Sequence, residues 1–283
     1  MKYAVFAPTA ELNEVIRYYW VLECVPNSAT PPVYQEMADS SPELIFQYNG
    51  GYLDFGREQG HFIAQKSINR SRILSKEIGM FGIRFFPHAS QLLIKGSSVE
   101  LTNKTYNLID IIGNSAKTLV EQINNSLDTT ERIEFASAFF KKMLKGKQTD
   151  PIRKIVKEMM LLDGEVSIRK MQEITQLSER QFERRFLATT GFTPRHMARI
   201  LRFQSTKRKY ITCKFPSLSE LAHGCGYYDQ SHFIREFKEF SGMNPKAYFD
   251  LLDSDAGAAR IIKGLSIPKD TFSESDRRFI ILK

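Results

Sequence analysis

The sequence has few cysteines and no long apolar run, and each shortage excludes a class of protein. A disulfide framework or a zinc site needs cysteines in pairs at short spacing. The three cysteines are far apart and odd in number: Cys24, Cys213 and Cys225. No stretch approaches the roughly 18 consecutive apolar residues of a membrane-spanning helix. The first residues lack a basic region followed by an apolar run, so we expect no signal peptide and a cytoplasmic protein that does not enter a membrane.

The sequence is also poor in the patterns on which catalysis depends. It has no GxSxG elbow, no phosphate-binding glycine loop and no CxxC pair. Of the five histidines, only His61 and His88 fall in the first half of the chain, and a catalytic metal site needs about three protein ligands. We therefore predict no catalytic residue, no cofactor and no metal site. A metal enzyme stays open as a lesser hypothesis.

Positive charge, by contrast, is present in excess and is concentrated near one end. The net charge is +8. The segment from Pro151 to Asp250 contains 18 Lys and Arg against 11 Asp and Glu, which accounts for nearly all of it. A basic excess confined to one region is typical of a surface that binds phosphates.

A length of 283 residues suits two domains, and the first 110 or so residues have the texture of a β-rich domain. Short apolar runs alternate with turn signals, which predicts strands at Tyr18–Val25, Leu44–Tyr48 and Gly79–Phe86. Asn49-Gly50-Gly51 predicts a tight hairpin turn, because its central positions tolerate positive φ. Many short strands with Gly and Pro turns indicate a barrel or a sandwich.

Between Leu108 and Leu144 the pattern becomes helical. Apolar residues recur at helical spacing in two stripes: Leu119, Ile123, Leu127, and then Ile133, Ala136, Phe140, Leu144. Thr130 is the predicted N-cap of the second helix. The stripes fit packing on the β-rich domain, or pairing with a second copy of the chain; the first is favoured. Lys145–Asp150 is polar and is the predicted linker.

These boundaries predict an α+β protein of two domains. The expected parts are a β-rich domain (1–110), a helical segment with the linker (111–149), an all-α domain (150–250) and a tail (251–283). The tail ends in an apolar run that is able to dock on the protein.

The predicted all-α domain contains an internal repeat. One copy runs from Ser167 to Pro194 and the other from Ser217 to Pro245. Two phenylalanines, a glycine and a proline recur 51 positions later: Phe182, Phe186, Gly191 and Pro194 as Phe233, Phe237, Gly242 and Pro245. Each copy has the pattern of helix, tight turn and second helix.

Local signals mark the ends of these helices. Ser178 with Gln181, and Ser217 with Glu220, have the spacing of a capping box. Asp229 is a predicted N-cap, and the repeated glycine ends each second helix. Between the copies lies a basic helical stretch, Pro194 to Thr212, which is expected to hold the two units apart and to contact phosphates through Arg199, Arg202, Lys207, Arg208 and Lys209.

This arrangement suits double-stranded DNA. The major groove admits one helix, and Arg or Gln side chains on that helix bond to guanine or adenine edges. Two such helices on one side of the duplex enter successive grooves, about 34 Å apart. Two copies and a basic connector therefore favour sequence-specific DNA binding over plain helix packing.

The stretch from Gly226 to Pro245, GYYDQSHFIREFKEFSGMNP, closely resembles the signature of the AraC family of transcription regulators. The first copy also fits, although Gln172 and Gln176 stand where the family usually has Ala and Gly. The resemblance covers about 100 residues and implies an all-α DNA-binding domain with two helix-turn-helix units. It implies base contacts by Arg180, Glu183 and Arg184 in the first unit, and by Gln230, Ser231, His232 and Arg235 in the second.

The N-terminal part is similar to the β-rich domain that precedes many AraC-type DNA-binding domains. The matching stretches are Tyr18-Tyr19-Trp20, Pro42 to Phe46, and Gly82 to Pro87 with Leu92-Leu93. The resemblance implies a cupin-like barrel that senses a small-molecule effector or mediates dimerisation. A domain that only dimerises or binds another protein stays open, as do RNA polymerase as a partner and a monomer or homodimer as the assembly.

Overall fold

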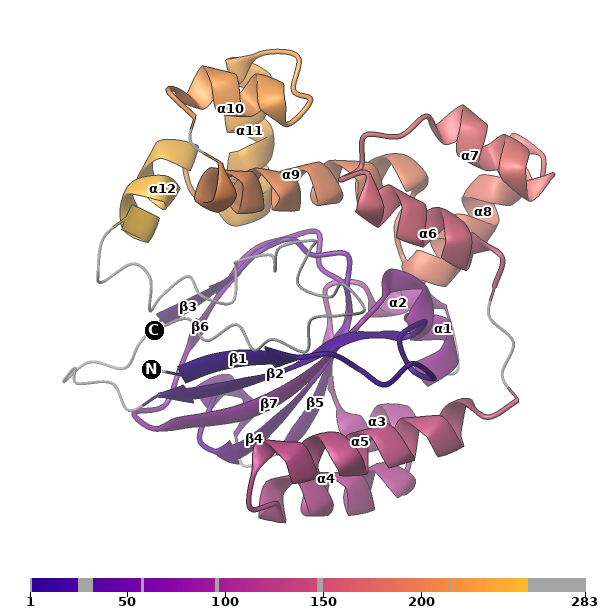
Figure 1. The fold of residues 1–283 in the computed structure, drawn as a ribbon, viewed down its shortest axis with the longest axis vertical. Coiled ribbons are helices and arrows are strands. Elements are labelled where there is room, and N and C mark those ends of the chain that lie inside the picture. Colours follow the sequence, from indigo (N-terminus) through magenta and orange to yellow (C-terminus); the bar gives the residue numbers. More distant parts are fainter. Residues whose placement is uncertain are drawn as a thin grey trace.

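The fold comes from a computed structural model, which describes residues 2–24, 33–56, 59–94, 97–146, 150–213 and 215–253. The predicted linker falls partly outside this range, at 147–149, and so does nearly all of the predicted tail, at 254–283. Strands dominate the first part of the chain and helices the rest, as Figure 1 shows. The α+β class and a β-rich first part followed by a helical part with two helix-turn-helix units are confirmed.

The N-terminal part is built on a six-stranded antiparallel sheet in the order β1-β2-β7-β4-β5-β8. Its strands are β1 (Lys2–Phe6), β2 (Ile16–Cys24), β4 (Glu43–Asn49), β5 (Gly60–Ile63), β7 (Ile78–Phe85) and β8 (Thr105–Asn107). The three predicted strands correspond to β2, β4 and β7. At the centre, Trp20 lies opposite Gly82 in the ladder, and a Cβ at Gly82 would come within 1.9 Å of the indole ring. The glycine therefore makes room for the ring.

Two further strands, β3 (Val33–Glu36) and β6 (Arg70–Ile73), form a small antiparallel sheet beside the larger one. The tight hairpin predicted at Gly50 is wrong. β4 does pair with the next strand, but β5 begins only at Gly60, after a longer connection with a 3-10 turn, η1 (Leu53–Phe55). Gly50 does adopt positive φ, yet a Cβ there would lie 2.1 Å from the carbonyl oxygen of Glu77. Gly50 is therefore required for two reasons: its positive φ and its close contact with the backbone of Glu77.

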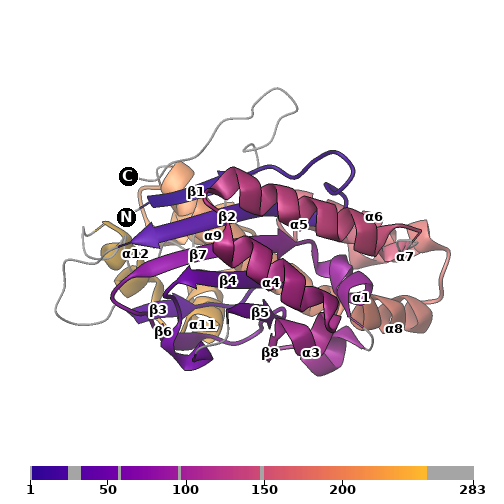
Figure 2. The same ribbon diagram turned by 90° about the horizontal axis from the view of Figure 1, so that it is seen from below.

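Helices cover one face of the large sheet, as Figure 2 shows from below. They are α3 (Leu108–Ile112), α4 (Ser115–Asn125) and α5 (Thr129–Leu144). Leu119, Ile123 and Phe140 are fully buried against the sheet, so the packing favoured from the sequence is present. Two details of the prediction are wrong. Leu127 lies beyond the end of α4 and is 94% exposed, and the N-cap of α5 is Asp128 instead of Thr130.

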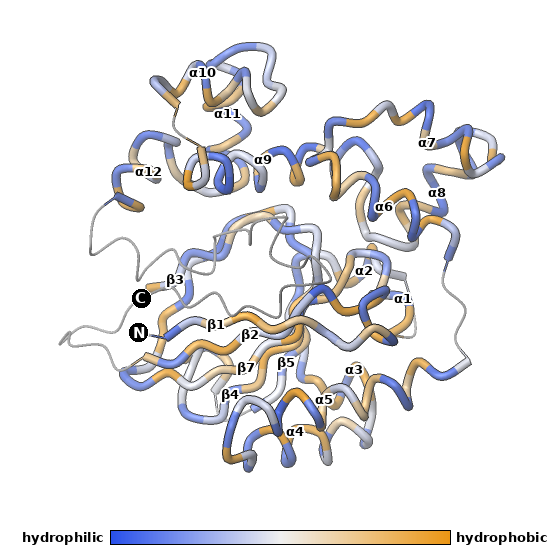
Figure 3. Tube along the Cα trace, in the orientation of Figure 1, coloured by the Kyte–Doolittle hydropathy of each residue, from blue (hydrophilic) through white to orange (hydrophobic). Residues whose placement is uncertain are grey.

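The C-terminal part is helical and lies over the other side of the sheet (Figure 1). Short helices after β7 lie beside it, namely η2 (Pro87–Ala89), α1 (Ser90–Leu93) and α2 (Ser98–Leu101). The remaining helices are α6 (Ile152–Leu161), α7 (Ile168–Thr175), α8 (Glu179–Thr190), α9 (Pro194–Thr212), α10 (Leu218–Gly224), α11 (Gln230–Ser241) and α12 (Pro245–Asp253). Both hydrophobic and hydrophilic residues occur along these helices, as the colours in Figure 3 show. None of the described helices is long and apolar enough to cross a membrane.

The two parts share a core as well as a boundary. Met37 and Ala38, from the segment after β3, belong to the same apolar cluster as the helices of the C-terminal part. Arg153 and Lys157 of α6 both pair with Glu14 of the N-terminal part, at 2.9 and 2.7 Å. The orientation of the helical part on the sheet is therefore set by apolar packing and by ion pairs.

Candidate nucleic-acid interface

The first unit is α7, a short turn and α8. Ser167 caps α7 through the backbone N–H of Lys170. The turn places Gln176 in the left-handed region, with φ +55°, which is a position that suits glycine better. Ser178 and Gln181 form the complete reciprocal capping box at the start of α8, as predicted. Gly191 ends α8 in the left-handed conformation, also as predicted.

The second unit repeats this plan with α10 and α11. Ser217 accepts a hydrogen bond from the N–H of Glu220, which is one half of the predicted capping box. Asp229 caps α11 by accepting from the N–H of His232, at 2.6 Å. Gly242 ends α11 in the left-handed conformation. Pro245 is the first residue of α12.

The repeated phenylalanines account for the orientation of both second helices. They are buried in one core: Phe182, Phe186, Phe233 and Phe237. With these faces turned inward, the remaining positions on the first turns must face outward. Each unit thereby presents the exposed N-terminal half of one helix to solvent.

The seven residues predicted to contact bases lie on these two N-terminal halves. Six are exposed: Arg180, Glu183 and Arg184 on α8, and Gln230, Ser231 and Arg235 on α11. His232 differs, since it is half-buried, with its ring edge on Tyr227 and its Nε2 atom 3.7 Å from Glu236. The structure thus brings the predicted residues together as two separate sets, and His232 is partly engaged within the protein.

The two units are joined by α9, a single helix of 19 residues. At a rise of about 1.5 Å per residue it spans about 28 Å, which is close to the separation of successive major grooves. The helix is a bridge with buried sides, and Met197, Ile200 and Phe203 have no exposed surface. It therefore has the length and the packing to hold the units apart, as predicted.

Four of the five cations of α9 that were expected to contact phosphates have partners within the protein. Arg199 bonds Glu236 and Glu239, at 2.7 and 2.6 Å. Three others are similar: Arg202 donates to the carbonyl of Gly226 and Lys209 to that of Gly224, while Arg208 pairs with Asp163. Arg199, Arg202 and Lys209 thereby fasten the second helix-turn-helix unit to α9, and Arg208 fastens the turn after α6. Contact of these side chains with phosphates stays a prediction.

Lys207, the fifth cation, lies inside the protein. It is 4% exposed and extends along the buried stripe of α9 toward the N-terminal part. Its Nζ atom is 4.0 Å from the sulfur of Met37 and 4.9 Å from the ring centre of Phe203, and no carboxylate of the described residues pairs with it. Burial, together with the charges of Arg84, Lys66 and Arg208, lowers the pKa of Lys207 to about 7.

The sequence analysis missed the burial of Lys207, although a signal was present. Lys207 follows Ile200 and Phe203 at helical spacing, which places it on the apolar face of α9. A charged residue on such a face is unusual, because an ammonium group loses its hydration there. The periodicity was therefore sufficient to single out this lysine from its neighbours.

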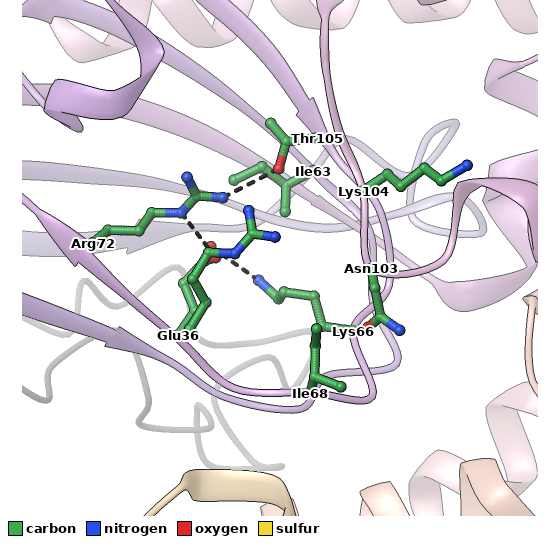
Figure 4. A pocket seen from close by; sticks show the side chains of 9 residues that line it. Glu36, Ile63, Lys66, Ile68, Arg72, Asn103, Lys104 and Thr105 are labelled. Carbon is green, nitrogen blue, oxygen red and sulfur yellow. Dashed lines mark hydrogen bonds and ion pairs between the residues drawn. The ribbon is translucent and has the colours of Figure 1, made fainter.

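Beneath α9, the N-terminal part contains a buried network of charges. Glu36 pairs with Lys66 and Arg72, at 3.3 and 2.8 Å, and Glu43 pairs with Arg84 at 3.0 Å. Figure 4 shows the small cavity beside Lys66 and Arg72. Its volume is about 10 Å³, which is room for about one water molecule.

The two histidines of the β-rich part lie apart. The ring of His61 stacks on that of Phe55, and His88 is near Glu14, whose carbonyl oxygen is 2.9 Å from Nε2. Burial lowers the pKa of His88 to about 4. No group of three or more His, Cys, Asp or Glu residues is arranged to hold a metal ion in the part of the chain that the structure describes.

Two protein-family models match separate parts of the chain. Residues 171–250 match the model of a helix-turn-helix domain. Residues 4–107 match the model of a domain of unknown function, DUF6597. A search of curated proteins found no significant match.

Among solved structures, the chain is similar to ToxT from Vibrio cholerae. One structure of ToxT at 1.65 Å resolution is 14% identical, with 83% of this chain and 99% of that chain covered and a TM-score of 0.44. Another, bound to (E)-4-(8-methylnaphthalen-1-yl)but-3-enoic acid, is 15% identical, with 78% and 98% covered and a TM-score of 0.42.

The family match over residues 171–250 coincides with both helix-turn-helix units, including the signature between Gly226 and Pro245. The matched segment also contains α9 and the two exposed helix faces described above. The chain therefore carries a helix-turn-helix domain at its C-terminal end, and the stretch that resembles the AraC-family signature lies within it.

Proposed function

We propose that the chain recognises specific DNA sequences by inserting α8 and α11 into successive major grooves. One observation carries the proposal: two equivalent helices expose their N-terminal halves, and one packed helix of about 28 Å joins the two units. A recognition helix contacts base edges mainly through its N-terminal residues. This geometry suits two half-sites about one helical turn apart.

The side chains suggest a role for each unit. Arg180 and Arg184 are able to donate two hydrogen bonds to a guanine, and Glu183 is able to accept one from the amino group of a cytosine. Gln230 suits adenine, while Arg235 suits guanine or a phosphate. His232 shares its environment with Glu236, so we assign it a smaller part in base contacts.

The test is selection of bound sequences from a random duplex pool, with the full chain at about 150 mM salt, where nonspecific binding is weakened. Two enriched blocks about one helical turn apart are the expected result. One block means that a single unit contacts bases. Absence of any enriched sequence, from a protein that still binds DNA at low salt, contradicts the proposal.

We further propose that a small anionic effector acts at the boundary between the N-terminal part and α9, with Lys207 as its anchor. The ammonium of Lys207 is buried and has a sulfur atom as its only hydrogen-bond partner among the described residues. A buried charge is costly unless it is paired, so a ligand carboxylate there would relieve that cost. Lys66 and Arg84 are each paired with a glutamate, yet their charges still lower the pKa of Lys207, so an anion that pairs with Lys207 would offset their effect.

Titration calorimetry on the full chain with carboxylic acids of increasing chain length tests this. Binding should weaken as the pH rises above about 7, because the ligand needs the charged form of Lys207. Lys207→Met should reduce the affinity at least tenfold, about 1.4 kcal/mol, whereas Lys209→Met should not. If no acid binds and the chain sediments as a dimer, the N-terminal part serves association instead.

A further inference from the structure

The C-terminal ends of both recognition helices are held by the N-terminal part of the chain. The last carbonyls of a helix have no partner within the helix and need one elsewhere. On α8, the carbonyl oxygen of Thr189 accepts from the hydroxyl of Ser98, at 3.0 Å. On α11, the carbonyl oxygen of Phe240 accepts from the backbone N–H of Ala38, at 3.0 Å. Thr189 and Phe240 are equivalent positions of the repeat, 51 residues apart.

The glycines that end the two helices are also equivalent, and both lie against the same part of the chain. A Cβ at Gly191 would come within 1.9 Å of the Nε2 atom of Gln65, and one at Gly242 within 2.5 Å of the Oδ1 atom of Asn69. Both have positive φ, +78° and +76°. These glycines therefore serve two purposes, since they end a helix and also permit close approach of the N-terminal part.

The residues that meet the two helix ends are linked to one another. The neighbour of Ala38, Asp39, exchanges two backbone hydrogen bonds with Lys66, each 2.7 Å long. The amide of Gln65 donates to the carbonyl of Ser98, at 2.7 Å. We call the residues that meet the helix ends the docking surface: Ala38, Gln65, Asn69, Ser98 and Thr102. One connected surface thus holds both units at once.

The docking surface contacts the C-terminal ends of α8 and α11, whereas the predicted base contacts lie in their N-terminal halves. Arg180 and Arg184 lie in the first half of α8 and remain exposed, whereas Thr189 has no exposed surface. Arg235 on α11 is likewise exposed. The contact therefore leaves the DNA-facing ends uncovered while it restrains the direction of both helices.

We propose that the docking surface sets the separation and relative orientation of α8 and α11, and that Ser98 and Asn69 are thereby positioning residues for the spacing of the two DNA half-sites. The alternative is that α9 alone sets this geometry. The inference rests on the proposed function where it concerns DNA, but the restraint on the helices is measurable without DNA.

The experiment compares the full chain with the variant Ser98→Ala/Asn69→Ala. The first change removes the hydroxyl that bonds Thr189, and the second removes the amide that donates to the carbonyl of Glu239, at 3.3 Å. The control Asn114→Ala/Ser115→Ala makes the same two chemical changes at exposed positions on the other side of the sheet. Ser98→Thr/Asn69→Ala restores a hydroxyl at the first position and should recover part of any effect.

The first readout is the distance between spin labels on the exposed Glu179→Cys and Lys238→Cys, with Cys24 and Cys213 replaced by serine. The parent and the control should each give one narrow distance. The Ser98→Ala/Asn69→Ala variant should give a broad distribution, at a melting temperature close to that of the control. A narrow, unchanged distance in that variant shows that Ser98 and Asn69 do not position the helices, and overturns the proposal.

The second readout is affinity for duplexes whose two half-sites are moved apart one base pair at a time. One added base pair turns the second half-site by roughly 34° around the duplex axis. The affinity of the parent for that duplex should therefore fall about tenfold or more. The variant should lose less than about threefold, because its units reorient more freely. An equally steep loss in both proteins overturns the proposal. If the parent prefers no DNA sequence, the proposed function fails while the spin-label distance still decides the restraint.

Discussion

The two helix-turn-helix units differ in charge and burial at one pair of equivalent positions, Arg185 and Glu236. In the first, Arg185 on α8 pairs with Asp150 at 2.9 Å, and its side chain is 45% exposed. At the equivalent position of the second, the carboxylate of Glu236 on α11 is 1% exposed and pairs with Arg199 at 2.7 Å. The same repeat thus carries opposite charges in different environments.

This difference shows how a duplicated motif is adapted to two neighbours. The first unit is restrained mainly by η2, α1 and α2 of the N-terminal part, which pack on α8. The second is fastened to α9 through Glu236, and the backbone carbonyls of its turn region bond to cations of α9. Shared apolar positions preserve the fold of each unit. The first unit is attached by packing and hydrogen bonds to the N-terminal part, and the second is attached to α9 by ion pairs as well.

The largest difference in stability between the two units is expected at Glu236. Removal of a buried carboxylate leaves its partners unpaired, so Glu236→Ala should lower the free energy of unfolding by about 3 kcal/mol. Arg185→Ala should lower it by less than about 1 kcal/mol, since that pair is partly exposed and solvent weakens it. Urea denaturation of both variants measures the difference. Equal losses would show that burial does not distinguish the two pairs.

Lys207 on α9, the helix that joins the two units, should make the stability of the protein depend on pH. The pKa of Lys207 is about 7 in the folded protein, below its value of 10.5 in the unfolded chain. Between these values the unfolded chain holds more protons, so the contribution of Lys207 to stability rises as the pH increases from 7 toward 10. Thermal unfolding at several pH values should show this rise, and Lys207→Met should flatten it. A slope retained in that variant places the titrating group elsewhere.

The two units should also differ in their share of base recognition. Arg184→Ala is expected to lose roughly 1–3 kcal/mol of discrimination at one base pair of the selected site. Arg235→Ala should lose less, because Arg235 suits a phosphate as well as a guanine, and a phosphate contact carries no sequence information. Binding to a panel of single-base variants measures both. Equal weakening on all sequences would falsify the assignment of Arg184 to base contacts.

The smallest expected difference is at the helix caps. Ser178→Ala and Asp229→Ala should each destabilise the protein by about 1 kcal/mol, because each removes an acceptor from an otherwise unpaired backbone N–H. At low salt, Asp229→Ala should cost a few tenths of a kcal/mol more than Ser178→Ala, since the charge of Asp229 also interacts favourably with the positive end of the helix dipole. Thermal unfolding at low and high salt checks this. A gap that persists at high salt has another origin.

Local patterns were sufficient for most of the helical part. The periodic phenylalanines, the caps at Ser178 and Asp229, and the glycines that end α8 and α11 were predicted and are present. They depend on residues within a few positions of one another, and such interactions are visible in one sequence. Six of the seven predicted base contacts are exposed where expected, His232 is half-buried, and the role of all seven stays a prediction.

Features that depend on distant residues were predicted less well. Gly50 was assigned to a tight hairpin, but its surroundings include Glu77, which is far along the chain. The cations of α9 were expected to face phosphates, but their partners lie in α10, α11 and the turn near Asp163. In each case the sequence showed the type of residue but not the distant residue that contacts it, because such contacts form only when the chain folds.

The sequence by itself determined the two helix-turn-helix units, their basic character and the β-rich class of the first part, since these follow from spacing, capping and composition. Only the tertiary structure decided that Lys207 is buried and that Ser98 and Ala38 bond the ends of the recognition helices. The physical reason is that burial and hydrogen-bond pairing are properties of surfaces that meet. No periodicity within one segment specifies which surface another segment will bring to it.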